Sequence, residues 1–106
     1  MSSHVVDLQK WAHLSIFEQM GNIGSEVGRT FSALRRNDAK RADSAFRRGL
    51  DLLDATAVVW AAKRPERSKE VLRARDVFAE AVIRQQPDGK LEAYFMQFAI
   101  AGRLHR

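Results

Sequence analysis

The sequence predicts an all-α fold: an antiparallel, up-and-down four-helix bundle whose first helix is long and contains glycines. Apolar residues recur at steps of three and four, the spacing that one buried helix face requires. No run alternates with period two, so no strands are expected. Short connectors place consecutive helices side by side and antiparallel. At 106 residues the chain is expected to form one domain over 1–106.

The first helix is expected over about residues 7–36, with Asp7 as its N-cap. The residues on its apolar face are Ile16, Met20, Ile23, Val27, Phe31 and Leu34. A second stripe, here the small-residue stripe, is predicted to pack against another helix and consists of Gly21, Gly24, Ser25, Gly28 and Ser32. Glycine costs a helix about 0.5–1 kcal/mol relative to alanine, so close approach within or between subunits is the expected compensation. The helix either continues through Gly21–Gly24 or kinks there.

The second helix is expected over about residues 38–63, after a connector at Asn37 and Asp38. Asn tolerates the left-handed conformation that ends helices, and Asp is a good N-cap. Residues 55–62 read ATAVVWAA and are apolar all round. Because a helix with one buried side does not need this, the segment is either central in the fold or part of a subunit contact.

The third helix is expected over about residues 66–86, with Pro65 suited to its first turn. The run Pro87-Asp88-Gly89 has turn chemistry at each position and separates it from a last helix over about residues 90–104.

Positive charge is concentrated in two segments of the chain. The net charge is +5 and the pI is about 10.2, which favours a polyanionic partner. Residues 29–50 hold seven basic against two acidic side chains, and residues 63–75 hold six against two. Connectors near residues 37 and 64 should lie at opposite ends of an antiparallel bundle, so basic residues are expected at both ends.

The first basic segment supplies the candidate nucleic-acid-binding residues, which are Arg29, Arg35, Arg36, Lys40, Arg41, Arg47 and Arg48. Arginine outnumbers lysine among them, as phosphate recognition favours its planar guanidinium. The alternative is an ordinary solvated helix face. The aromatic residues Phe31, Phe46 and Trp60 fall on predicted buried faces, so binding would be directed at the nucleic-acid backbone rather than at stacked bases.

The sequence predicts no catalytic residue, metal site or cofactor. Cysteine is absent, and the histidines are too scattered to form a helical metal pair: His4, His13 and His105. The glycines keep helical phase with the apolar face, which favours packing over a phosphate-binding loop. No secretory signal or membrane-length apolar run is seen, so a non-enzymatic cytoplasmic protein without membrane contact is expected.

The segment from Asn22 to Arg29 (NIGSEVGR), followed by Leu50-Asp51-Leu52-Leu53, resembles the four-helix-bundle proteins encoded in ribosomal RNA intervening sequences. It also resembles the related accessory variability determinant of diversity-generating retroelements. This resemblance spans about residues 16–60. It implies a basic bundle that forms ring-shaped homo-oligomers and binds a reverse transcriptase and nucleic acid. By the resemblance, these residues would face nucleic acid or an acidic partner: Arg29, Arg35, Arg36, Arg41, Arg47 and Arg48.

Two function hypotheses therefore stand. In the first, a basic helical bundle self-associates and binds RNA, DNA or a nucleoprotein enzyme such as a reverse transcriptase. In the second, a structural or adaptor bundle acts through protein–protein contacts without nucleic acid. The second hypothesis rests on the apolar segment 55–62 and on the aromatic run at Tyr94, Phe95 and Phe98.

Overall fold

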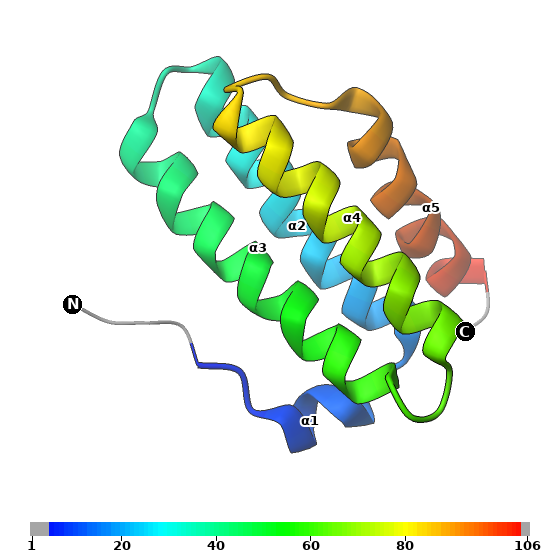
Figure 1. Ribbon diagram of the computed structural model, residues 1–106. Coiled ribbons are helices and arrows are strands. Elements are labelled where there is room, and N and C mark those ends of the chain that lie inside the picture. Colours follow the sequence, from blue (N-terminus) through cyan, green and yellow to red (C-terminus); the bar gives the residue numbers. More distant parts are fainter. Residues whose placement is uncertain (1–4, 105–106) are drawn as a thin grey trace.

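A computed structural model describes residues 5–104 of the protein (Figure 1). These residues form no strand, which confirms the all-α class. They form five helices: α1 (Leu8–His13), α2 (Ile16–Arg35), α3 (Ala39–Trp60), α4 (Pro65–Ile83) and α5 (Gly89–Leu104).

Helix α2 packs against α3 on one side and α5 on the other, and α4 packs against α3 (Figure 1). The four long helices alternate in direction, and the short α1 lies against α3. The α2–α3 and α3–α4 connectors lie at opposite ends of the molecule, as expected from the connector lengths (Figure 1).

The prediction of one long first helix over residues 7–36 is wrong. Asp7 does cap α1 and accepts from the amides of Gln9 and Lys10, but α1 ends at His13. Ser15 then starts a new helix through a capping box, because its hydroxyl accepts from the Glu18 amide while its own amide donates to the Glu18 carboxylate. The break therefore lies before the glycines, and α2 continues through Gly21–Gly24 without interruption.

The later connectors match their local sequence signals. Asn37 adopts the left-handed conformation with φ of 57°, and Asp38 caps α3 by accepting from the Arg41 amide. Pro65 occupies the first turn of α4. Helices α3 and α4 end at Trp60 and Ile83, each three residues earlier than predicted.

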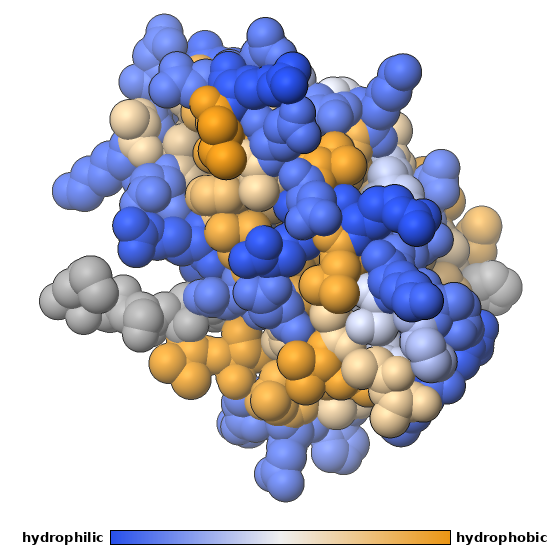
Figure 2. All heavy atoms as spheres, in the orientation of Figure 1, coloured by the Kyte–Doolittle hydropathy of each residue, from blue (hydrophilic) through white to orange (hydrophobic). Residues whose placement is uncertain are grey.

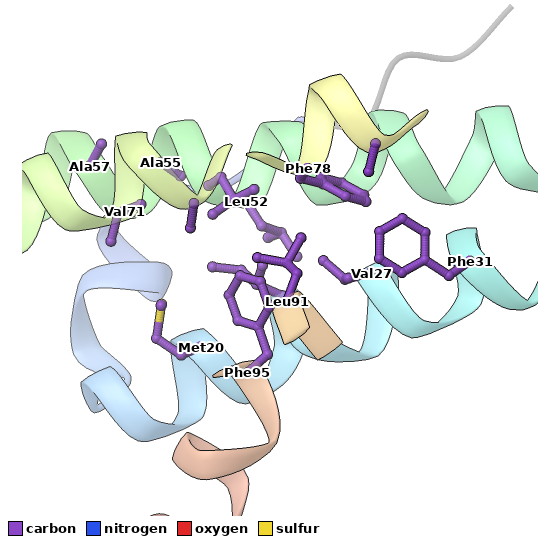
Figure 3. Packing of buried hydrophobic residues seen from close by; sticks show 14 of the residues in the cluster. Met20, Val27, Phe31, Leu52, Ala55, Ala57, Val71, Phe78, Leu91 and Phe95 are labelled. Atoms are coloured by element: carbon purple, nitrogen blue, oxygen red, sulfur yellow. The ribbon is translucent and has the colours of Figure 1, made fainter. Parts of the chain in front are cut away.

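Aromatic residues from three helices meet in the core. The Phe78 ring of α4 lies edge to face with Phe31 of α2 and Phe46 of α3, with ring centroids 5.8 and 5.1 Å apart. Figure 3 shows side chains from α2 to α5 pointing into this shared interior, among them Met20, Val27, Leu52, Val71, Leu91 and Phe95.

Within the apolar segment 55–62, residues 55–57 are buried in the fold, and side chains from three other helices contact the segment. The Trp11 indole of α1 donates to the Thr56 hydroxyl, and the Ser68 hydroxyl of α4 donates to the Ala57 carbonyl. The Trp60 indole donates to the Gln19 side chain of α2. Val58, by contrast, is 63% exposed. In the described part of the chain, no helix is long and apolar enough to cross a membrane.

Candidate nucleic-acid interface

An open groove of about 690 Å³ runs between the C-terminal half of α2 and the N-terminal half of α3. We call it the arginine groove, because α2 and its C-cap residue contribute Arg29 and Arg36, and α3 contributes Arg41 and Arg48. Its lining residues are Ser25, Gly28, Arg29, Ser32, Ala33, Arg36, Arg41, Ser44, Ala45 and Arg48. Figure 2 shows hydrophilic residues gathered over the end of the molecule where α2 and α3 join.

The groove stays open because small residues lie between the arginines. A Cβ added at Gly28 would meet no atom within 4 Å, so this stretch of α2 is uncovered. Ser25 and Ser32 are exposed on the same helix. A ligand could therefore approach the α2 backbone closely at Gly28.

Of the three glycines in the small-residue stripe, only Gly24 lies in close contact with another helix. At Gly24 an added Cβ would lie 2.8 Å from the Phe95 Cβ, so α5 does approach α2 closely there. At Gly21, as at Gly28, the space is open. Within residues 5–104, the stripe thus serves helix packing at Gly24 and lines a surface groove at its other end.

Two of the groove arginines are tied together by Glu26. The Arg48 Nε donates to Glu26 Oε2 at 3.2 Å, and Arg29 Nη1 lies 3.3 Å from the same oxygen. The Arg48 Nη1 also donates to the Ser44 hydroxyl at 2.7 Å. These hydrogen bonds hold the Arg48 guanidinium at two points. Arg29 and Arg41 are mostly exposed and make longer ion pairs, at 3.3 Å with Glu26 and 3.4 Å with Asp38.

The other three predicted binding residues lie outside the groove. Arg35 pairs with Glu92 of α5 at 2.7 Å, and Arg47 pairs with Asp43 on its own helix at 2.9 Å. Lys40 is exposed in the first turn of α3. The structure thus brings together four of the seven predicted residues: Arg29, Arg36, Arg41 and Arg48.

In the second basic segment, near the α3–α4 connector, three arginines contact other side chains of the protein. The Arg67 guanidinium lies 4.5 Å from the centroid of the Trp60 ring, a cation–π contact. Arg64 pairs with Glu66, and Arg75 pairs with Asp54, each at 2.6 Å. Contacts within the chain therefore occupy these three cations.

The groove has the chemistry of an anion site. It is lined by guanidinium groups and serine hydroxyls, all of which can donate hydrogen bonds to phosphate oxygens, and by no aromatic ring on which a base could stack. Among residues 5–104, no three His, Asp or Glu side chains are grouped to hold a metal ion.

Sequence reasoning identified the arginines but missed Glu26 and Ser44, which hold them in place. A usable signal was present, because Glu26 lies three residues before Arg29, and Ser44 lies four before Arg48. Comparisons with protein-family models, curated proteins and solved structures find no match to this chain.

Proposed function

We propose that this protein is a non-enzymatic, basic four-helix bundle that binds nucleic acid through the arginine groove. It self-associates and acts in the cytoplasm as an accessory factor to a nucleoprotein enzyme such as a reverse transcriptase. The observation that carries the proposal is the convergence of Arg29 and Arg36 from α2 with Arg41 and Arg48 from α3 around small residues.

The phosphate backbone is the part of a nucleic acid that fits this chemistry. Guanidinium groups match phosphate oxygens geometrically, and backbone contacts set position and affinity without reading sequence. Without aromatic side chains in the groove, selectivity for particular bases is not expected.

A salt titration with short labelled RNA and DNA duplexes tests the proposal. Four arginine–phosphate contacts predict a slope of log K against log salt of about −3.6. Affinity should then fall about 150-fold between about 50 and 200 mM salt. Absence of binding at low salt, or binding that does not weaken with salt, would refute nucleic-acid binding.

Charge reversal distinguishes binding by the groove arginines from nonspecific binding by the overall positive charge of the protein. The double substitution Arg36→Glu and Arg41→Glu should abolish binding while leaving the fold intact, because both groove arginines are exposed and neither pairs with the largely buried Glu26. The matched control, Arg47→Glu with Arg84→Glu, makes the same charge change at two exposed arginines that pair within their own helices. Equal losses in the two variants would show that the groove is not the binding site.

Self-association and the enzyme partner follow from the resemblance of residues 22–29 and 50–53 to intervening-sequence and retroelement accessory proteins. Light scattering at micromolar concentration measures self-association. A strict monomer would contradict it. A reverse transcriptase gene beside this one, with pull-down of its product by this protein, would support the enzyme partner, and failure of the pull-down would contradict it.

A second candidate, an adaptor that works through protein–protein contacts alone, is favoured by exposed apolar side chains on two helices. Leu72, Val77 and Ile83 are exposed on α4, and Met96 and Ile100 on α5. Figure 2 shows apolar residues reaching the surface in separate places on one face. Self-association without any binding to RNA or DNA at low salt would favour this candidate.

A further inference from the structure

The Glu26 carboxylate bridges the two walls of the arginine groove. Through Oε2 it contacts Arg29 on its own helix and Arg48 on α3. The Glu26 side chain is only 13% exposed, and its Oε1 atom is buried without a hydrogen-bond donor from the residues that the structure describes.

This arrangement differs from an ordinary surface ion pair. In the Arg47–Asp43 pair of α3, the two side chains are 69% and 59% exposed, so both charges stay solvated. Burying a carboxylate with one oxygen unpaired costs free energy that a solvated pair avoids. Such a costly buried group is therefore a good candidate for a functional role.

We infer that Glu26 is a positioning residue for phosphate binding, an inference that rests on the proposed function. One carboxylate oxygen holds a guanidinium group from each wall, and the Ser44 hydroxyl gives Arg48 a second fixed contact. A free arginine side chain loses rotamer freedom when it binds a ligand. Arginines that are already fixed lose less, so a phosphate binds them more tightly.

Simple electrostatics predicts the opposite effect of Glu26. A negative charge beside the groove repels a polyanion, so removing it should tighten binding if charge alone matters. If Glu26 acts by positioning Arg29 and Arg48, removing its charge should weaken binding although the net charge becomes more positive. The direction of the change in affinity therefore distinguishes positioning of the arginines from simple charge repulsion.

The test compares Glu26→Gln with Asp43→Asn, which removes the same charge from the solvated pair outside the groove. With the labelled duplex at low salt, Glu26→Gln should weaken binding roughly threefold to tenfold, and Asp43→Asn should leave it equal or tighter. The salt slope of Glu26→Gln should also become shallower by about one, because a phosphate contact is lost. A merely structural role would not change that slope.

Glu26→Gln binding as tightly as the unchanged protein, or more tightly, would overturn the inference while leaving the proposed function standing. If the unchanged protein binds no duplex, the proposed function fails, and this inference fails with it. Should a thermal melt show that Glu26→Gln is unfolded, Glu26→Asp replaces it. That variant keeps the charge but is one methylene too short to reach both arginines, so the same loss is expected, and unchanged binding would overturn the inference.

The arginine side chains give a readout that needs no ligand. In the nuclear magnetic resonance spectrum of the unchanged protein, the Arg48 Nε–H signal should be shifted and protected from exchange, because that group donates to Glu26. In Glu26→Gln the signal should move toward the position of a solvated arginine. An unchanged signal would show that Glu26 does not hold Arg48.

Discussion

Two glycines of the same helix should respond oppositely to alanine. Gly24→Ala places a Cβ 2.8 Å from the Cβ of the buried Phe95, which is not the end of a flexible side chain, so α2 and α5 must move apart. Such overpacking costs about 1–3 kcal/mol, against a gain in helix propensity of about 0.5–1 kcal/mol. At Gly28 the added Cβ has open space around it, so Gly28→Ala should show only the stabilisation from higher helix propensity.

Thermal unfolding followed by circular dichroism measures both variants. In a domain of this size, 1 kcal/mol corresponds to about 4–8 °C in melting temperature. Gly28→Ala should therefore melt about 2–8 °C higher than the unchanged protein, and Gly24→Ala should melt lower by up to about 15 °C. If Gly24→Ala melted as high as Gly28→Ala, the close approach of α5 to α2 at this position would be refuted.

Three further predictions use the groove and the buried polar contacts. Gly28→Leu should not lower the melting temperature, since leucine also favours a helix over glycine, but it should weaken duplex binding in the salt titration because its side chain occupies the groove; unchanged affinity would argue against ligand contact at this site. Thr56→Val should lower the unfolding free energy measured with denaturant by about 1–3 kcal/mol, since it leaves the buried Trp11 indole without its acceptor. Burial and the hydrogen bond to Glu70 raise the pKa of Tyr94, so its contribution to stability is present below about pH 10 and is lost above it as the unfolded chain ionises first. Melting curves of Tyr94→Phe should lack that part of the alkaline loss.

Local signals in the sequence gave the correct structure where the deciding contacts are also local. The roles of Asn37, Asp38 and Pro65 can be predicted from the sequence, because a left-handed residue, a cap and a first-turn proline act within one helical turn. The signal for the helix break at Ser15 is equally local, but apolar residues continue at helical spacing on both sides of Ser15, so the sequence looks like one continuous helix. The capping box with Glu18 should have outweighed that periodicity.

The candidate site was predictable only in part, because it depends on contacts between helices. Seven basic residues can be predicted from the sequence as a set, but their distribution over the surface depends on how α2 packs against its neighbours. Arg35 points to Glu92 of α5, whereas Arg36, the next residue, lines the groove. Gly24 and Gly28 have different surroundings for the same reason, since Gly24 faces α5 and Gly28 faces the groove.

The spacing of the arginines supports backbone contact more strongly than their number does. Arg29 and Arg36 on α2 are seven residues apart, as are Arg41 and Arg48 on α3, so each pair lies about two turns apart along one side of its helix. Seven residues of α-helix rise about 10.5 Å, so the two guanidinium groups of each pair are far enough apart to contact different phosphates of one backbone. An ordinary solvated face has no need for two matching pairs on facing helices with small residues between them. A groove that binds a regularly charged backbone needs arginines at such intervals on both sides. The arrangement therefore favours a nucleic acid over an isolated phosphate.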